Sequence, residues 1–532
     1  MEKIVTVPKE TQGSASAFTV KALEELSLTG GTLRFEPGVY HFFASDALHA
    51  PFAVINNGMD EKAIAFPLLF ADHVTVDGNG SRFVFHEGAF PFIVSGSKNV
   101  TLRDFTVDTA LSPTIFAKAA SVGETGFTLA LEGDLPPFAI EDGSLIFDRE
   151  GRILSGRERR FSLHGLDKLN IKYLFSGDCR SPKSNLAAPF VSADALSLDG
   201  RMLSFCYRED TGIRFPYALG EPFALNLAEN RDVCAFFFED SENVTVENVC
   251  IRRFGGMGFV GSCAKDVVLR DITTADAFPS LTADAFHFVN CSGALLLESC
   301  RMSGFLDDAI NVHGVYGVLE DLRGDTLHGK FGHKSHRFFK YLKDGDEVVF
   351  IDPATREIKA HAIVSAMTFD KETGMTFTAQ CGFIDGADAL EKGFLIEDPA
   401  RMPDVTVRGC RFSDYPHIRL SGGGKIVVEN NVFERTAAGL VVHDLAQYWF
   451  ESGRVRDVTV RNNIFRSANA LGGSAVVDIG VPGFEPDKMP IVHENVRIVG
   501  NRLEGACRIP VNAHGVKGLV FEENTVVPPE TT

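Results

Sequence analysis

Three aspartates fall within one short stretch of the chain, TADAFHFVNCSGALLLESCRMSGFLDDAINVHG at 282–314. Asp284 and Asp308 open the similar phrases DAFHF and DAINV and lie 24 residues apart, and Asp307 directly precedes Asp308. In a fold that coils once every 24 residues, the three carboxylates would meet at one corner of two consecutive coils. Like charges held close together separate their pKa values, which suits one group to act as an acid and the others as a base. The alternative is an aspartate ladder that stabilises turns, or a Ca²⁺ site.

Several polar residues are candidates for binding a substrate beside these carboxylates. His287 and Asn311 hold equivalent positions in the two coils, and His313 follows two residues after Asn311. Arg419 in HIRLSG and Asp444 at the end of GLVVHD fall in later coils. Each could hydrogen-bond a sugar hydroxyl, and Arg419 could instead hold an aspartate. The alternatives are a solvent-facing polar stack and a surface arginine.

The single tryptophan, Trp449, lies in QYWFESG, within an excursion between coils at about 446–456. An aromatic ring can stack on the apolar C–H face of galactose, and Glu451 could bind hydroxyls such as the axial 4-OH. The alternative for Trp449 is a hydrophobic plug. Two basic runs, GRERR at 156–160 and GHKSHRFFK at 332–340, are expected to be solvated surface.

The elements that would position these residues are indicated by an internal repeat. A strand-like phrase of alternating character, followed by a polar turn and a second short strand, recurs from Val74, Val100, Val244, Val267, Leu295, Val405, Ile426, Val458, Val496 and Leu519. A period of about 20–30 residues with strands and no helix is typical of a parallel β-helix, whose coils stack about 4.8 Å apart. One turn position is always small or amide-bearing, which predicts a stacked ladder of Cys300, Cys410, Asn431, Asn463, Asn501 and Asn524.

The fold expected from these repeats is all-β, a right-handed parallel β-helix with inserted small β-barrel or β-sandwich domains. Residues 14–26 are predicted to form an N-terminal capping helix, with Ser14 or Ser16 as its N-cap, because an open end would expose unpaired edges. The domains expected are 1–110 (cap and first coils), 111–230 (β-rich insertion), 231–315 (central coils with the catalytic aspartates), 316–403 (second insertion) and 404–532 (last coils).

Composition excludes several classes of protein. Hydrophobic residues make up 45% of the 532 residues and charged residues 23%, as in globular proteins. The longest apolar stretch, at 63–71, is too short for the roughly 18 residues that span a membrane. Because 52 basic residues face 71 acidic ones, a nucleic-acid partner is not expected. Ten cysteines without a CxxC pair, and no secretory signal in MEKIVTVPKE, predict free thiols and a cytoplasmic location, or a secreted or periplasmic one if a signal was removed.

The aspartate motifs also carry a resemblance. One aspartate followed one coil later by an aspartate pair is the pattern of inverting glycoside hydrolases on this fold, including the polygalacturonases. The phrases ADAFHF and DDAINVHG, the β-rich stretch after them, and QYWFESG before VTVRNNIF resemble glycoside hydrolase family 110 over nearly the whole chain. Polygalacturonases carry Gly-His-Gly and Arg-x-Lys after their aspartate pair, and this chain has HIRLSG instead. A uronic-acid substrate is therefore disfavoured.

The resemblance implies an exo-acting, inverting, metal- and cofactor-independent α-1,3-galactosidase acting on glycans with terminal α-galactose, either blood-group-B-type or linear Gal-α-1,3-Gal. It implies that Asp307 is the general acid and that Asp284 and Asp308 position and deprotonate the water. Two alternatives stay open: a polygalacturonase-like hydrolase of another glycan, and a non-catalytic carbohydrate-binding β-helix. No membrane partner is expected, and the oligomeric state is open.

Overall fold

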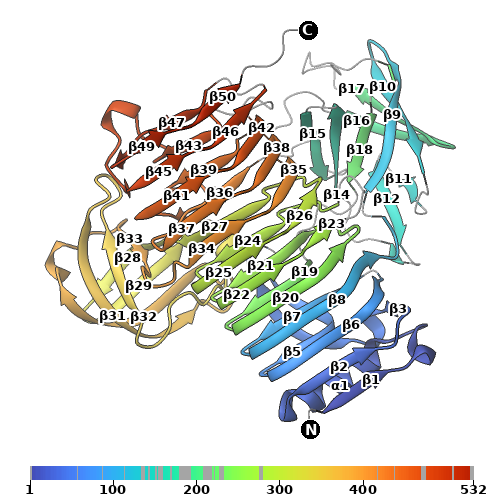
Figure 1. Cartoon of the computed structure of the whole chain (residues 1–532), viewed down its shortest axis with the longest axis horizontal. Coiled ribbons are helices and arrows are strands. Elements are labelled where there is room, and N and C mark those ends of the chain that lie inside the picture. Colours follow the sequence, from blue (N-terminus) through green and yellow to red (C-terminus); the bar gives the residue numbers. More distant parts are fainter. Residues whose placement is uncertain are drawn as a thin grey trace.

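The computed structural model describes most of the chain: residues 3–56, 58–86, 88–112, 114–133, 138–141, 144–149, 152–153, 160–167, 170–178, 193–207, 219–220, 222–226, 233–274, 280–415, 417–436, 438–468, 475–505 and 509–527. These residues wind into a parallel β-helix, seen in Figure 1 as a diagonal stack of strands from the blue N-terminal end to the red C-terminal end. Each regular coil gives one short strand to each of three parallel faces, so the predicted fold class is confirmed.

The first two faces form one continuous sheet. The strands of the first face are β2 (Gly31–Phe35), β6 (Asp72–Phe85), β8 (Lys98–Thr109), β20 (Glu242–Ile251), β22 (Lys265–Arg270), β25 (Ser292–Glu298), β34 (Asp404–Arg408), β37 (Lys425–Glu429), β41 (Asp457–Arg461), β45 (Val496–Val499) and β49 (Val520–Glu522). The second face holds β3 (Val39–Phe42), the second halves of β6, β8 and β20, then β23 (Thr273–Thr274), β26 (Arg301–Ser303), β35 (Arg411–Tyr415), β38 (Val432–Thr436), β42 (Ile464–Ala468), β46 (Arg502–Glu504) and β50 (Thr525–Val527).

The third face is a separate sheet and carries the residues of greatest chemical interest. Its parallel strands are β5 (Gly58–Leu69), β7 (Ala89–Ser95), β19 (Cys234–Glu239), β21 (Met257–Ser262), β24 (Phe286–Val289), β27 (Ile310–Val315), β36 (Ile418–Leu420), β39 (Leu440–His443), β43 (Val477–Gly480) and β47 (Val511–Ala513). At its N-terminal end β4 (Leu48–Val54) pairs antiparallel with β5, which makes a hairpin.

The repeated phrase of the sequence stands in register along the first face. Val74 pairs with Val100, Val100 with Val244, and so on through Val267, Leu295, Val405, Ile426, Val458 and Val496. All of these side chains are buried. The repeat therefore marks the position at which each coil points an apolar side chain into the core.

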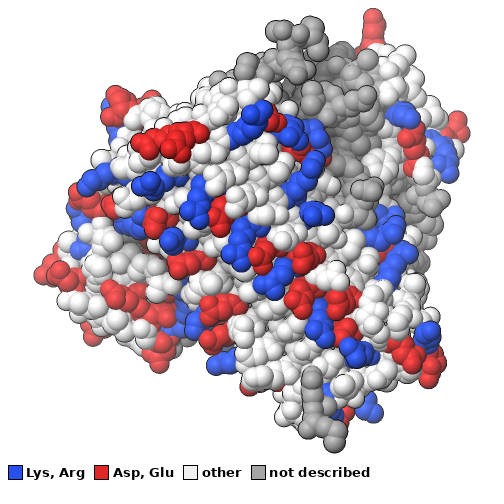
Figure 2. Space-filling model, viewed as in Figure 1, with Lys and Arg blue, Asp and Glu red and all other residues white. Residues whose placement is uncertain are grey.

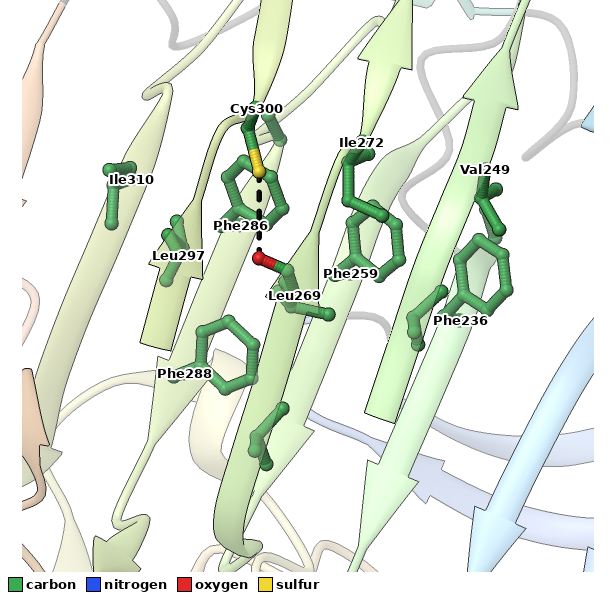
Figure 3. Close-up of a cluster of buried hydrophobic side chains, with 14 of the residues drawn as sticks. Phe236, Val249, Phe259, Leu269, Ile272, Phe286, Phe288, Leu297, Cys300 and Ile310 are labelled. Atoms are coloured by element: carbon green, nitrogen blue, oxygen red, sulfur yellow. Dashed lines mark hydrogen bonds between the residues drawn. The ribbon is translucent and has the colours of Figure 1, made fainter. Parts of the chain in front are cut away.

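The interior of the central coils is a column of stacked phenylalanine rings, which accounts for the abundance of this residue. The ring centroids of Phe92 and Phe236 lie 4.7 Å apart, those of Phe236 and Phe259 4.5 Å, and those of Phe259 and Phe286 5.2 Å. Figure 3 shows the last three rings on successive strands. Because equivalent residues lie above one another, an aromatic position repeats its contact from coil to coil.

The predicted turn ladder is confirmed. The backbone N–H groups of Cys410, Asn431, Asn463 and Asn501 each donate to the side-chain oxygen of the asparagine in the next coil, at 2.8–3.0 Å. The asparagine Nδ2 groups donate to carbonyls of the preceding coil. Cys300 replaces the amide with a thiol that points to the Leu269 carbonyl at 3.6 Å (Figure 3). Free thiols, as predicted, are found at Cys234, Cys250, Cys263, Cys291, Cys300, Cys381 and Cys410.

Helix α1 (Ser16–Thr29) covers the N-terminal end of the coils, beside β1 (Ile4–Val7) and β2 (Figure 1). Leu23 and Leu26 of the helix are buried in the main core. The predicted N-cap is wrong: Ala15 holds the N-cap position, and no side chain caps the helix. The Ser16 hydroxyl instead exchanges hydrogen bonds with the backbone of Phe43, and Ser14 donates to Asp46. Both serines thus join the helix to the first coil.

Two groups of antiparallel strands leave the coils. A seven-stranded sheet contains β9 (Thr114–Val122), β10 (Gly126–Glu132), β14 (Arg160–Asp167), β15 (Asn170–Asp178), β16 (Ala193–Asp199), β17 (Met202–Tyr207) and β18 (Pro222–Asn226), and a small sheet contains β11 (Phe138–Glu141), β12 (Ser144–Arg149) and β13 (Arg152–Ile153). A closed barrel contains β28 (Gly317–Arg323), β29 (Thr326–Phe331), β30 (Glu347–Ile351), β31 (Ile358–Phe369), β32 (Thr376–Asp385) and β33 (Leu395–Glu397).

The barrel shares a second hydrophobic core with the outer side of the third face. This core joins Val260 and Val289 of the coils, Ile55 of the β4–β5 hairpin, and Leu327 and Phe350 of the barrel. A sheet face that would otherwise meet water is therefore buried. Polar side chains that point outward from this face consequently lie in a covered place.

The outer surface of the coils is mixed in charge. Figure 2 shows Lys and Arg interspersed with Asp and Glu across the coils. Cross-coil ion pairs join them, such as Lys265–Glu242 at 2.8 Å and Arg466–Glu504 at 2.9 Å. Such exposed pairs contribute little each, about 0–1 kcal/mol, and mainly avoid stacking like charges. No helix among the described residues is long and apolar enough to cross a membrane.

The asparagine ladder provides a test of the stacking. Asn463→Ala would remove the side-chain donor to the Val428 carbonyl and the side-chain acceptor of the Asn431 N–H, and Asn501 Oδ1 would keep only the backbone N–H of residue 463. We expect a loss of about 3 kcal/mol of unfolding free energy, since each such group costs about 1–3 kcal/mol. Asn463→Cys, the residue used at 300 and 410, should lose clearly less. Equal melting temperatures for the alanine variant and the parent protein would contradict the ladder's role.

Candidate active site

The three aspartates lie where two consecutive coils enter the third face. Strands β24 and β27 pair Phe286 with Ile310 and His287 with Asn311, and the Ala285 N–H donates to the Asp308 carbonyl at 3.0 Å. Asp284 and Asp308 therefore hold the same position on neighbouring coils, about 4.8 Å apart along the stack. Asp307 precedes Asp308, and one of its oxygens accepts the Asp308 N–H at 3.1 Å. The sequence brings these carboxylates together as the 24-residue spacing predicts.

Asp308 is held by two groups of the next coil. Arg419 Nε on β36 lies 3.0 Å from Asp308 Oδ2, and His417 Nδ1 lies 3.1 Å from Asp308 Oδ1. The carboxylate is 5% exposed, so its charge has little water to stabilise it. The guanidinium and the imidazole together hold both carboxylate oxygens in place. Of the two roles predicted for Arg419, holding an aspartate is the one that the geometry supports.

Asp284 has a different partner, which comes from its own coil. His287 Nδ1 lies 2.6 Å from Asp284 Oδ2, and both side chains are buried. The other ring nitrogen, Nε2, lies 3.1 Å from Nδ2 of Asn56 and 3.3 Å from Nε2 of His313. His287 was expected to bind substrate, but the structure instead gives both of its nitrogens protein partners.

Asn311 and His313 occupy the outward positions of β27, and the covering segments explain their burial. Asn311 stands in register between His287 and Arg419, and its Oδ1 has no hydrogen-bond partner among the described residues. An amide oxygen of this kind can accept a hydrogen bond from a sugar hydroxyl. His313 Nδ1 donates to the Gly314 carbonyl at 2.7 Å.

Histidines gather under the barrel segment at 332–340. The 3₁₀ turn η3 (Lys334–His336) hydrogen-bonds to the β4–β5 hairpin, because the Asn56 N–H donates to the Ser335 carbonyl at 3.1 Å. Burial lowers the pKa of His313 and holds the pKa of His336 well below its usual value, which favours neutral rings. Burial also lowers the pKa of His333.

Trp449 and Glu451 lie on a short segment that crosses the end of β27. Strand β40 (Glu451–Ser452) pairs antiparallel with β27, and Glu451 Oε1 lies 3.7 Å from His313 Nε2. The Trp449 ring packs against His333, with centroids 4.7 Å apart, and is 41% exposed. That exposure disfavours the hydrophobic plug.

Asp444 does not join this group. It is fully buried, accepts the Tyr316 hydroxyl at 2.7 Å, and pairs with Arg356 Nε of the barrel at 2.9 Å. Both carboxylate oxygens thus fasten the barrel to the coils. The substrate-binding role expected for Asp444 is not supported.

Three contributors were missed by sequence reasoning. His417 opens HIRLSG and could have been found, because it lies two residues before Arg419 on the coil after the aspartate pair. Asn56 reaches the site from a hairpin far away in the sequence, and no local signal identifies it. His336 is buried, so the expectation that 332–340 is solvated surface is wrong for this residue, because the barrel folds onto the hairpin. In the other basic run, residues 156–159 lie outside the described part of the chain.

Within the described ranges, no group of three or more His, Cys, Asp or Glu side chains is arranged to hold a metal ion. The aspartate corner instead presents carboxylates paired with nitrogen donors. Chemically, such an arrangement can donate a proton from one carboxyl group and accept one at another.

The chain was compared with known proteins. It matches no family model. It is 26% identical over 535 residues to α-1,3-galactosidase B of Bacteroides thetaiotaomicron, covering 97% of this chain and 83% of that one. It is 28% identical over 517 residues to α-1,3-galactosidase A of Shewanella woodyi, with 94% and 80% covered. Among solved structures, an exopolygalacturonase from Thermotoga maritima has 14% identity and a TM-score of 0.39, with 100% and 93% covered. The predicted resemblance to α-1,3-galactosidases is confirmed.

The buried histidines predict how stability depends on pH. Because the pKa of His336 is depressed in the folded protein, the unfolded chain binds a proton below about pH 6.5 that the folded chain does not. Stability should therefore fall as the pH drops below that value. One such group changes the free energy of unfolding by up to about 1.4 kcal/mol per pH unit. His336→Phe removes this pH dependence, so between about pH 7 and pH 5 the melting temperature of the variant should fall less than that of the parent protein.

The matched control is His361→Phe, at a half-exposed position on the barrel. Its melting temperature should depend on pH as steeply as that of the parent protein. Equal slopes for the His336 variant and the parent would contradict the account of the buried imidazole.

Proposed function

We propose that this protein is an exo-acting glycoside hydrolase that removes terminal α-1,3-linked galactose from glycans, with inversion at the anomeric carbon. The observation that carries the proposal is the corner formed by Asp284, Asp307 and Asp308, with Asp284 and Asp308 in register on adjacent coils. The choice of galactose and of the α-1,3 linkage follows the names of relatives that match over nearly the whole chain.

Asp307 is assigned the general acid. Asp308 contacts a guanidinium and an imidazole, and Asp284 contacts His287, so each of these two carboxylates is held in place by nitrogen partners. Asp307 takes the role of general acid that the resemblance to glycoside hydrolase family 110 implies. It would protonate the glycosidic oxygen while the bond from that oxygen to the anomeric carbon breaks.

Asp284 and Asp308 are assigned the role of positioning and deprotonating the attacking water. One coil spacing between their backbones leaves two carboxylates that can both hydrogen-bond a single water molecule. Its oxygen would attack the anomeric carbon from the side opposite the leaving group and would pass a proton to the base. An inverting enzyme needs its acid and base roughly 6.5–9.5 Å apart, and side chains that diverge at a corner can reach that separation.

The galactose ring would lie on the covered outer side of the third face. Asn311 supplies an unpaired amide oxygen for a hydroxyl. Glu451 has a 13% exposed side chain next to His313 and can accept further hydroxyls. The half-exposed Trp449 ring is available to stack on an apolar sugar face. A glycan substrate with terminal α-galactose fits this set of groups.

The proposal is tested by hydrolysis of Gal-α-1,3-Gal, with p-nitrophenyl α-galactoside and oligogalacturonate as comparison substrates. The disaccharide should be cleaved to free galactose, and oligogalacturonate should not be cleaved. Replacing Asp284, Asp307 or Asp308 by Asn keeps the shape but removes the charge or the proton, so turnover should fall by about 10²- to 10⁴-fold in each case.

Asp457→Asn is the matched control, since Asp457 is exposed at the start of β41, on the first face. It should keep full turnover, and all four variants should retain a cooperative melt. Unchanged activity of Asp307→Asn, or cleavage of oligogalacturonate in place of the galactoside, would contradict the proposal.

A further inference from the structure

A line of hydrogen-bonded side chains leads from Asp284 through His287 to Asn56 of the β4–β5 hairpin. Asp284 Oδ2 lies 2.6 Å from His287 Nδ1, and His287 Nε2 lies 3.1 Å from Nδ2 of Asn56. Asp284 and His287 are 2% and 1% exposed. In each of these contacts one atom must donate a hydrogen and the other must accept it, because a buried polar group without a hydrogen bond destabilises the folded protein.

The position of the proton in this line follows from the amide group. A carboxamide nitrogen donates only, so Nε2 of His287 must accept and carries no hydrogen. A neutral imidazole with a bare Nε2 carries its hydrogen on Nδ1. That hydrogen points at Asp284 Oδ2, and a carboxylate that accepts it is favoured over a protonated carboxyl group.

Two groups lie beside Nε2 of His287. The Asn56 amide nitrogen, at 3.1 Å, favours this tautomer, whereas Nε2 of His313, at 3.3 Å, is a second acceptor and opposes it. His313 donates from Nδ1 to the Gly314 carbonyl, and burial lowers its pKa, so its Nε2 is bare and offers no hydrogen to His287. His336 lies nearby with a pKa held well below its usual value by burial. Glu451 faces His313 from β40, and Asp308 and Asp307 stand on the next coil.

The fold places Asn56 firmly. It sits at the tip of the β4–β5 hairpin with φ 63°, a backbone conformation that asparagine tolerates better than most residues. Its N–H donates to the Ser335 carbonyl of the barrel, so the hairpin tip is fixed between the barrel and the third face. The amide is therefore held in position by two distant parts of the chain.

We propose that Asn56 and His287 are positioning residues that keep Asp284 ionised and oriented, which makes Asp284 the base of the hydrolysis. Asn56 fixes the tautomer of His287, and His287 donates its Nδ1–H to Asp284. The role of Asp284 as a base rests on the proposed function. The tautomer of His287 does not depend on which reaction the protein catalyses. His287 thus acts through Asp284 and not by contact with the sugar.

The kinetic test compares pH profiles of kcat/KM. His287→Phe removes the donor, so the pKa of Asp284 should rise and the acid limb should move up by about one to two pH units, with KM little changed. His287→Asn places an amide nitrogen close to the position of Nδ1 and should return the limb to within a few tenths of a unit. An unmoved acid limb in His287→Phe together with a raised KM would overturn the proposal in favour of direct sugar binding.

The second test does not need activity. In protein with ¹⁵N-labelled histidine, the two ring-nitrogen shifts of His287, identified by their loss in His287→Asn, should report hydrogen on Nδ1 and a bare Nε2 at about pH 7. Asn56→Asp tolerates the same backbone and can only accept, so it should shift hydrogen onto Nε2. Asn56→Gly should release the preference without straining the hairpin.

The outcomes are distinguishable. Hydrogen on Nε2 of His287 in the parent protein would overturn the positioning role of Asn56 and His287. The same result follows if the ring-nitrogen shifts of His287 do not change in Asn56→Asp. If the parent protein hydrolyses no galactoside but His287 shows the expected tautomer, the proposed function fails, and the positioning of Asp284 by Asn56 and His287 stands.

Discussion

Parallel pairing in register is the constraint on which the rest of this structure depends. Each coil hydrogen-bonds to the next through three faces, so a residue has its equivalent about 4.8 Å above it for the length of the stack. This geometry multiplies whatever chemistry a position carries. Phenylalanine becomes a ring column, asparagine a hydrogen-bonded ladder, and aspartate a pair of facing carboxylates.

The same repetition creates a cost at the aspartate corner that the neighbouring residues offset. Two buried carboxylates on adjacent coils repel each other unless each has its own donor. The next coil supplies Arg419 and His417 for Asp308, whereas Asp284 takes His287 from its own coil. The two carboxylates therefore have separate nitrogen partners.

The barrel, the β4–β5 hairpin and β40 bury the outer side of the third face. The barrel shares its hydrophobic core with the third face, and the β4–β5 hairpin and β40 cover the remaining outward positions. Histidines that would be solvated on a bare coil are consequently dry and favour the neutral form. Asp444 and Arg356 fasten this cover and so support the site without contributing to it.

The parts of this structure that repeat along the sequence could be predicted from it. The phrases at Val74 and its equivalents gave the core register, and the turn position gave the Asn and Cys ladder, because stacking maps sequence period directly onto space. The same argument brought Asp284 and Asp308 together.

What could not be predicted depends on contacts that have no period. Asn56 meets His287 only because a hairpin folds across the third face, and Asp444 is buried only because the barrel returns to the coils. Ser16 resembles an N-cap locally but is used in a tertiary bond to Phe43. The domain bounds and the cytoplasmic location stay predictions.

The central claim is that the aspartate corner delivers water to the face of the sugar opposite the leaving group. Proton NMR of the first minutes of Gal-α-1,3-Gal hydrolysis tests it most directly, because the anomeric signals of the released galactose are resolved before mutarotation mixes them. The account predicts that β-galactose appears first. Initial release of α-galactose would mean a retaining, double-displacement enzyme and would contradict the roles given to Asp284, Asp307 and Asp308.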